Sequence, residues 1–221
     1  MNYAVILASG TGKRANNRVP KQFVKINSKA ILEYTIEAFN KNKLTDRIIL
    51  VINPSYLDFC KTLKYEKLYK VTEGGKRRQD SSRIGVNLIS EDDAKVLIHD
   101  GARPYVTDEL INKCYKALDC YDAVNTGVEL TDTIIEIDDK NIITNIPNRK
   151  KLLKCQTPQG FKSGLIKKAH KIAFERGIEV TDDTGLIVKL NLCDVHVIEG
   201  DIENIKITYP VDIIEAQRKL K

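Results

Sequence analysis

The sequence lacks a long hydrophobic run, since no stretch approaches the roughly 18 apolar residues of a membrane span. Its apolar start, YAVILA at residues 3–8, is too short for a signal peptide and meets its charges only afterwards. None of the five cysteines forms a CxxC pair, which favours reduced thiols. These cysteines are Cys60, Cys114, Cys120, Cys155 and Cys193. We therefore expect a soluble, cytoplasmic protein with no membrane partner.

Two common nucleotide-binding loops are also missing. No GK[ST] occurs at Walker A spacing, and the dinucleotide pattern GxGxxG is absent. The formal net charge is +6, but the cations are not interleaved with aromatic residues. This pattern argues against nucleic acid as a partner. Many cations instead stand beside Gly, Ser or Thr in short loops, which favours a small phosphorylated ligand.

What the sequence does contain is an alternation of short apolar runs with helical patterns over its 221 residues. Runs rich in β-branched residues predict buried strands, and the segments between them show helical spacing. The predicted strands are 3–8, 47–53, 67–75, 95–104 and 123–130, and the predicted helices are 30–42, 81–89 and 108–118. The order predicts one α/β domain, a three-layer sandwich with a mainly parallel sheet.

The later part of the chain departs from this alternation. Residues 131–147 hold two β-rich runs around a polar DDKN turn, which predicts an inserted hairpin or arm. Helical segments at about 163–176 and 183–190 follow, then a strand at 194–200. A terminal helix is expected after Pro210.

Clusters of cations and small residues follow three of the predicted strands, after Ala8, at Gly74 and at Asp100. Ligands of open α/β sheets bind at the carboxyl ends of the strands, so we expect these clusters to meet at one site. In the first cluster, GTGKR followed by PKQ, loop amides would hold a triphosphate while Arg14 and Lys21 neutralise its charge. An ordinary strand-to-helix turn with surface cations is the alternative.

The other clusters are weaker signals when taken alone. EGGKRRQDSS (73–82) is either an anion-binding helix start at Arg78 and Ser81 or a simple capped turn. In HDGARP (99–104), Asp100 is placed to bind a metal–phosphate complex and Arg103 to fork onto a phosphate. His99, which could be a base, is more often a structural residue at such a position. His170 and His196 are interpreted as peripheral, and Lys206 alone is an ordinary surface lysine.

Taken together, the ordered motifs resemble the CTP-dependent cytidylyltransferases that act on polyol phosphates. The series GTGKR…PKQF, GGKRRQDS, HDGARP, TDT, NR…QTPQGF, TDD and NIKIT covers nearly the whole chain, from Tyr3 to about Asp212. The resemblance implies a Rossmann-like nucleotidyltransferase fold in a single domain, 1–221, with a dimerisation β-arm at about 128–148. It implies that a substrate phosphate attacks the α-phosphorus of CTP and that pyrophosphate leaves, with Mg²⁺ as cofactor.

The resemblance also assigns roles to residues. Arg14 and Lys21 would stabilise the transition state, and Arg149 and Lys206 would position the attacking phosphate. The CTP site would comprise Ala8, Ser9, Gly10, Thr11, Gly12, Gly75, Arg78, Ser81 and Asp100, with Asp100 also binding the metal. The acceptor pocket would comprise Arg103, Thr133, Arg149, Thr181 and Lys206. Because the family exchanges its arms between subunits, a homodimer is expected, with Thr133 or Arg149 reaching the partner's site.

The identity of the acceptor is divided between two branches of this family. ILASGTG and IPNR look like the branch that makes CDP-ribitol for teichoic acid or capsule, and Leu7 stands where the other branch usually has proline. HDGARP and TDDTGLIV look like the methylerythritol branch of isoprenoid synthesis. Two residues depart from the family's usual pattern: Lys76 replaces an acidic residue that often follows the paired glycines, and Ala15 replaces the methionine common after the arginine. We expect D-ribitol 5-phosphate as acceptor, with 2-C-methyl-D-erythritol 4-phosphate as the alternative and a non-catalytic nucleotide- or RNA-binding module as a remote one.

Overall fold

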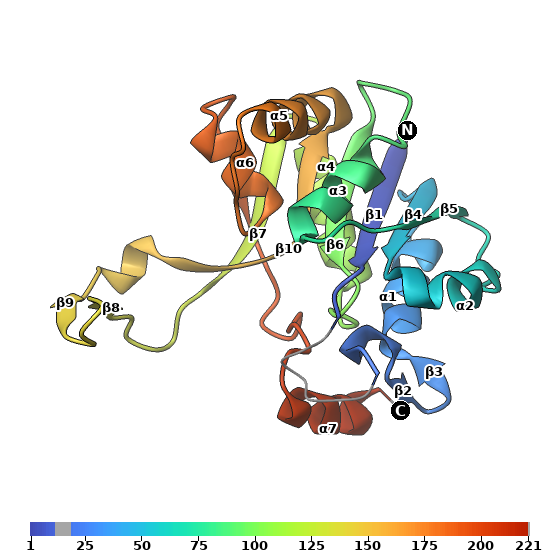
Figure 1. Ribbon diagram of the computed structural model, residues 1–221, viewed down its shortest axis with the longest axis horizontal. Helices are drawn as coiled ribbons and strands as arrows, with labels where there is room; N and C mark the ends of the chain where they lie inside the picture. Colours follow the sequence, from blue (N-terminus) through green and yellow to red (C-terminus); the bar gives the residue numbers. More distant parts are fainter. Residues whose placement is uncertain (12–18, 221) are drawn as a thin grey trace.

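A computed structural model describes residues 1–11 and 19–220 (Figure 1). Its centre is a seven-stranded sheet in the order β11-β7-β10-β6-β1-β4-β5. The strands are β1 (Asn2–Ala8), β4 (Arg47–Ile52), β5 (Leu68–Glu73), β6 (Lys95–Asp100), β7 (Ala123–Glu129), β10 (Leu153–Lys162) and β11 (His196–Glu199). All neighbours pair in parallel except β10, which runs antiparallel to both β6 and β7.

The central strands are apolar throughout because both faces of the sheet are covered. Along β1, the side chains alternate between two cores: Ala4 and Ile6 belong to one, Val5 and Leu7 to the other. One core lies under α1 (Ile31–Lys41), α2 (Leu57–Lys61) and α4 (Asp108–Ala117). The other lies under α3 (Arg78–Val86), α5 (Ser163–Glu175) and α6 (Asp183–Lys189). These two helix layers around a mainly parallel sheet confirm the predicted three-layer α/β fold.

Strand β10 was not among the predicted strands. Its sequence, LKCQTPQGFK, contains a proline and a glycine, which are depleted in strand interiors. Pro158 is accommodated because the pairing with β7 shifts register between Cys155 and Gln159. Gly160 is required by close packing, since a Cβ there would meet side chains of Val124 and Leu97 at 2.7 and 2.9 Å.

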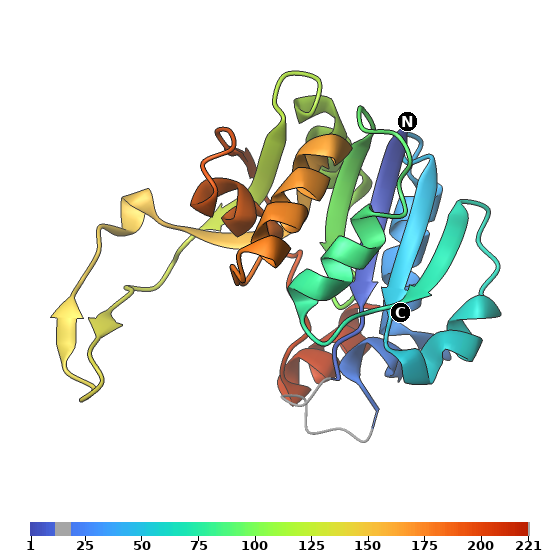
Figure 2. The same cartoon turned by 45° about the horizontal axis from the view of Figure 1, so that its top comes forward.

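The arm predicted at 131–147 is a hairpin. β8 (Glu136–Ile137) and β9 (Ile143–Asn145) pair antiparallel, and a short 3-10 helix, η4 (Arg149–Lys151), leads back to β10. The arm projects away from the sheet and its helices (Figure 2). Its apolar side chains are exposed, about half or more in each case: Ile135, Ile137, Ile142, Ile143 and Ile146.

The remaining elements surround the carboxyl end of the sheet. They are η2 (Lys21–Phe23), β2 (Lys25–Ile26), β3 (Lys29–Ala30), η3 (Pro54–Tyr56) and α7 (Pro210–Lys219). Ile26, Ile31, Ile207 and Ile213 form a third, small core that joins α7 to this end. In the part of the chain that the structure describes, no helix is long and apolar enough to cross a membrane.

Two predicted element boundaries matter for the site, and one of them was wrong. The strand predicted over 95–104 ends at Asp100, and a turn begins at Gly101. The helical pattern recognised over 81–89 belongs to a helix that covers Arg78–Val86, which confirms that Arg78 stands at the helix start. Asp100 and Arg78 thus both lie at the end of the sheet.

Candidate active site

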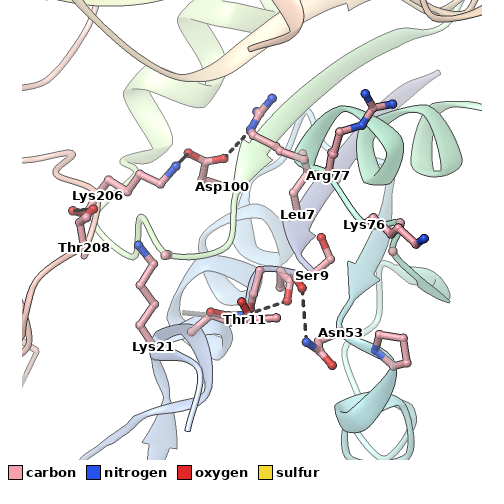
Figure 3. A pocket seen from close by; sticks show the side chains of 18 residues that line it. Leu7, Ser9, Thr11, Lys21, Asn53, Lys76, Arg77, Asp100, Lys206 and Thr208 are labelled. Carbon is pink, nitrogen blue, oxygen red and sulfur yellow. Dashed lines mark hydrogen bonds and ion pairs between the residues drawn. The ribbon is translucent and has the colours of Figure 1, made fainter. Parts of the chain in front are cut away.

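A pocket of about 680 Å³ lies at the carboxyl ends of β1, β5 and β6 (Figure 3). Parallel strands bring the segments that follow them to this edge, as the sequence predicted. Lys21 points into the pocket from η2, toward the side on which Lys206 lies. The lining includes Ala8, Ser9, Gly10, Thr11, Lys21, Gly75, Arg78, Asp100 and Lys206, all predicted site residues. Arg14 and Gly12 lie outside the described residues.

The segment after β1 is held by a side chain that sequence reasoning missed. The Gln22 amide donates to the carbonyls of Ala8 and Gly10, at 2.8 and 2.6 Å, and the residue is 3% exposed. Because its two N–H bonds fix two carbonyls of one turn, Gln22 sets the direction of the neighbouring backbone amides. The residue stands in the PKQ motif beside Lys21, but an uncharged glutamine carries no sequence signal for this role.

Replacing Gln22 with glutamate tests this arrangement. In Gln22→Glu, carboxylate oxygens would face the Ala8 and Gly10 carbonyls in place of a donor, which leaves both acceptors unpaired. We expect CTP affinity to fall by about tenfold or more, measured by titration calorimetry. Gln22→Met removes the two bonds without adding a charge and should have a smaller effect. Equal affinities of Gln22→Glu and the wild type would contradict the assigned role.

The turn between β5 and α3 packs against the same loop. Ser81 is fully buried, and its hydroxyl lies 2.7 Å from the Ser9 hydroxyl and accepts the Gly75 N–H at 3.1 Å. A Cβ at Gly74 would collide with the Ser9 side chain, so only glycine allows this approach. Gly75 lines the pocket directly, whereas Ser81 acts on it by holding Ser9 and Gly75.

Asp100 is the centre of the charge arrangement. Its Oδ1 accepts Arg78 Nε at 3.1 Å, and its Oδ2 lies 2.8 Å from Lys206 Nζ and 3.7 Å from Arg103 Nε. Burial alone would raise the pKa of the Asp100 carboxyl. The charges of Arg78, Lys206 and Arg103 outweigh burial and hold that pKa well below its usual range. Asp100 is therefore an ionised carboxylate at the pocket wall.

Arg103 does not line the pocket but holds the segment around Asn204 in place. It is 6% exposed, and its Nη1 donates to the Asn204 carbonyl at 2.7 Å. The Asn204 amide in turn donates to the Thr157 carbonyl at 2.7 Å. These bonds fix the segment that presents Lys206. A direct contact between Arg103 and an acceptor phosphate stays a prediction.

Two of the three histidines are buried, but neither lines the pocket. Burial lowers the pKa of His99 to about 3, so this ring is neutral. Its two nitrogens lie 3.0 and 3.2 Å from the Thr157 hydroxyl and the Arg103 carbonyl, which fits the structural interpretation. His170, predicted to be peripheral, lies outside this pocket, but it is only 1% exposed, with its Nε2 3.2 Å from the Ser82 hydroxyl and 3.4 Å from Asp183 Oδ1.

The remaining predicted residues do not line this pocket. Thr133 and Arg149 are exposed on the arm, and Arg149 Nη1 donates to the Thr131 carbonyl at 2.6 Å. Thr181 is exposed just before α6, two residues from Asp183. Within one chain, the described structure thus brings the CTP residues and Lys206 together but leaves the arm residues apart.

Asp100 is the pocket carboxylate through which a metal ion would be bound. Among the described residues, no group of three or more His, Cys, Asp or Glu side chains is arranged to hold a metal ion. Mg²⁺ commonly binds through one or two carboxylates together with substrate phosphates and water. Asp100 is ionised and lines the pocket. One of its oxygens bonds to Arg78 and the other to Lys206. The donor set therefore fits a metal that arrives with a polyphosphate, and not a metal held by the protein alone.

The sheet is mainly parallel, Gln22 holds two carbonyls of the loop after β1, and cations surround an ionised carboxylate at the carboxyl ends of the strands. Such an arrangement is typical of a nucleotide-binding site in an α/β protein. The family model for 2-C-methyl-D-erythritol 4-phosphate cytidylyltransferase matches residues 2–221. The chain belongs to that family. It is therefore an enzyme of the cytidylyltransferase class, with CTP as co-substrate, as the motifs predicted.

Individual relatives match this chain along nearly their whole length. The enzyme of this name from Clostridium perfringens is 43% identical over 222 residues, covering 99% of this chain and 98% of that protein. The one from Caldanaerobacter subterraneus subsp. tengcongensis is 40% identical over 223 residues, with the same coverage. The crystal structure of 4-diphosphocytidyl-2C-methyl-D-erythritol synthase from Anaerococcus prevotii matches with a TM-score of 0.88 at 32% identity, covering 100% of this chain and 98% of that one.

These matches correct the expected acceptor. The sequence motifs were interpreted in favour of D-ribitol 5-phosphate, but the family model and the curated relatives carry the methylerythritol name. Ribitol 5-phosphate and cell-wall synthesis are not supported. The alternative acceptor, 2-C-methyl-D-erythritol 4-phosphate, is the better interpretation.

Proposed function

We propose that the enzyme transfers CMP from CTP to 2-C-methyl-D-erythritol 4-phosphate and releases pyrophosphate. The observation that carries the chemistry is the pocket in which Lys21 and the Asp100–Lys206 pair face the loop after β1. The acceptor rests on the family match over residues 2–221.

In this reaction an oxygen of the acceptor phosphate forms a bond to the α-phosphorus of CTP. The bond from that phosphorus to the bridging oxygen of pyrophosphate breaks, and pyrophosphate leaves with the electron pair. Charge builds on non-bridging and leaving oxygens, so fixed cations lower the barrier without a protein nucleophile. Lys21 and Arg14 are proposed to stabilise this charge, with the amides of the segment from Ala8 to Gly12 and of Gly75 holding the nucleotide.

Asp100 is proposed to hold a Mg²⁺ ion that comes with CTP. When bound, the ion would neutralise phosphate charge during transfer. Arg78 would fix one oxygen of this carboxylate and Lys206 the other, at the distances given above. Lys206 would also orient the acceptor phosphate, because it is at once a pocket residue and a neighbour of Asp100.

The acceptor pocket is proposed to need a second copy of the chain. Thr133 and Arg149 lie on an arm that projects from the body, and neither lines the pocket of its own chain (Figure 2). The arm's exposed isoleucines are costly in water and favour burial against a partner. In a homodimer with exchanged arms, Arg149 would complete the partner's acceptor pocket beside Arg103, Thr181 and Lys206.

A mixing experiment tests whether Arg149 acts in the partner's site. Lys21→Ala disables a pocket, and Arg149→Ala disables an arm. After equimolar subunit exchange, half of the dimers are mixed and one of their two sites is intact, so about one quarter of wild-type activity should return. If the mixture stays as inactive as its components, Arg149 acts within its own chain or the arms do not exchange.

The oligomeric state can be measured directly. Light scattering at micromolar concentration should give about 50 kDa, twice the chain mass of 25.0 kDa. A double variant, Ile143→Glu with Ile146→Glu, puts charges on the exposed arm face and should shift the mass toward a monomer. A wild-type mass of one chain would count against the homodimer.

The acceptor is tested by pyrophosphate release from CTP and Mg²⁺. 2-C-Methyl-D-erythritol 4-phosphate and D-ribitol 5-phosphate are supplied in parallel reactions. We expect the first to be turned over at least about 100-fold faster, because a pocket that hydrogen-bonds one pattern of hydroxyls rejects another. Faster turnover of ribitol 5-phosphate would overturn the proposed acceptor, while no turnover of either would overturn the proposed pair of substrates.

A further inference from the structure

A line of ionisable side chains continues from the pocket wall into the interior, behind Asp100. Arg78 joins two carboxylates: its Nε donates to Asp100 Oδ1 at 3.1 Å and its Nη1 to Asp183 Oδ2 at 2.7 Å. The second oxygen of Asp183 lies 3.4 Å from His170 Nε2. Asp183 and His170 are each 1% exposed, so this end of the line is closed to solvent.

The Arg78 guanidinium holds both carboxylates of the line by hydrogen bonds. Burial alone would raise the pKa of Asp183, but the charge of Arg78 outweighs burial and keeps that pKa low. His170 Nε2 lies 3.2 Å from the Ser82 hydroxyl, its hydrogen-bond partner, and 3.4 Å from Asp183 Oδ1, which has no hydrogen-bond partner among the described residues. The Asp183 backbone N–H is itself fixed by the Gln159 side chain at 3.0 Å.

Three elements supply the line, which makes it a product of the tertiary fold. Arg78 begins α3, Asp183 begins α6, and His170 lies in α5. Neither Asp183 nor His170 lines the pocket that holds Asp100. Arg78 Nη2 is buried and, among the described residues, without a hydrogen-bond partner, so the guanidinium is oriented by its two carboxylates alone.

We propose that Asp183 and His170 are positioning residues: through Arg78 they fix the orientation of the Asp100 carboxylate for the metal–nucleotide complex. Without Asp183, Arg78 has one carboxylate left and is free to turn toward the phosphates or away from Asp100. Asp100 would then keep its charge but lose its set direction. This inference rests on the proposed role of Asp100 in binding Mg²⁺ with CTP.

The first test uses Asp183→Asn, which removes the charge and keeps the shape. Partners that orient a metal ligand typically change metal affinity or activity by 10–100-fold. We expect the Mg²⁺ concentration for half-maximal activity to rise by about tenfold or more, with a smaller change in KM for the acceptor. Asp182→Asn is the matched control: it removes a carboxylate at the same helix start that does not touch Arg78, and asparagine still caps α6.

A second readout needs neither metal nor substrate. In ¹⁵N-labelled protein, the Arg78 Nε–H held by Asp100 should give a slowly exchanging signal, assigned by its loss in Arg78→Lys. Asp183→Asn should broaden or shift this signal, and Asp182→Asn should leave it in place. A wild-type signal together with a wild-type Mg²⁺ requirement in Asp183→Asn would overturn the proposal. Because this signal does not depend on turnover, it separates a failure here from a failure of the proposed function.

His170 keeps the proposal testable if Asp183→Asn does not fold. His170→Gln retains an N–H donor near the position of Nε2, whereas His170→Asn places its amide too far back to reach Ser82 or Asp183. The Gln variant should show nearly the wild-type Mg²⁺ requirement and Arg78 signal. The Asn variant should shift both in the direction of Asp183→Asn. Equal behaviour of the two variants, whether both normal or both impaired, would contradict a role through Nε2.

Discussion

Lys21→Ala is expected to lower turnover by about 100- to 1,000-fold at saturating CTP, with the fold intact. Lys21 points into the pocket from η2, on the side of Lys206 (Figure 3). A fixed cation gains most when charge develops on the phosphate oxygens, so its loss lowers kcat more than it raises KM for CTP. The measurement is the steady-state rate of pyrophosphate release.

Lys25→Ala is the matched control for this prediction. Lys25 lies four positions further on, is exposed on β2, and does not line the pocket. Its replacement changes the net charge by the same amount and should leave kcat unchanged. A Lys21→Ala enzyme that retains a near-normal rate would remove Lys21 from the proposed mechanism. Equal losses in both variants would attribute the effect to overall charge.

The parts of the fold that the sequence predicted are those decided by local pattern. The runs at 3–8 and 47–53 are apolar on both faces and could hardly be anything but buried strands. Strand β10 was not predicted because Pro158 and Gly160 are unfavourable in an isolated strand. They are tolerated only where the register shift and the closely packed Val124 and Leu97 receive them. Such compensation is tertiary and leaves no local signal.

The candidate site divides in the same way. Charged residues after strand ends, such as Lys21 and Asp100, were found because position and charge are both visible in a sequence. Gln22 was missed because its function depends on which carbonyls its amide meets. His170 did carry a signal: it lies on the buried stripe of α5 with Ile166, Ala169 and Ala173. A histidine on an apolar stripe indicates a buried polar partner, which here is the Ser82 hydroxyl, with Asp183 beside it.

The identity of the acceptor was not predictable from short motifs. Short motifs such as IPNR favoured the ribitol branch, while agreement along residues 2–221 favoured the methylerythritol family. Selectivity between two polyol phosphates depends on a few hydrogen bonds to hydroxyl groups, and no short motif reports them. The resemblance of loops and cations therefore identified the chemistry before it identified the substrate.

Asp100→Asn is expected to lower both activity and stability. Activity should fall by at least about 100-fold, because the proposed metal–nucleotide complex loses its carboxylate and Arg78 and Lys206 lose a shared anion. Breaking a buried ion pair by removing one partner typically costs about 3 kcal/mol. The free energy of unfolding at pH 7, measured with urea, should fall by about that amount.

The pH dependence of the free energy of unfolding tests whether Asp100 is ionised in the folded chain. The pKa of Asp100 is lower in the folded chain than the value of about 4 in an unfolded chain. Its contribution to stability is therefore fully present above pH 4 and is lost as the pH falls from there toward the folded pKa. The deficit of Asp100→Asn relative to the wild type should shrink by about 1 kcal/mol between pH 7 and pH 3.

Asp92→Asn separates this effect from a general loss of carboxylates. Asp92 pairs with Lys167 at 2.9 Å on the surface, where its side chain is 79% exposed. Exposed pairs contribute little, so this variant should match the wild type in activity and in unfolding at both pH values. A deficit of Asp100→Asn that stays constant from pH 7 to pH 3 would mean that Asp100 is not held ionised by its cations. The pocket would then lack the fixed negative charge on which the proposed metal–CTP site depends.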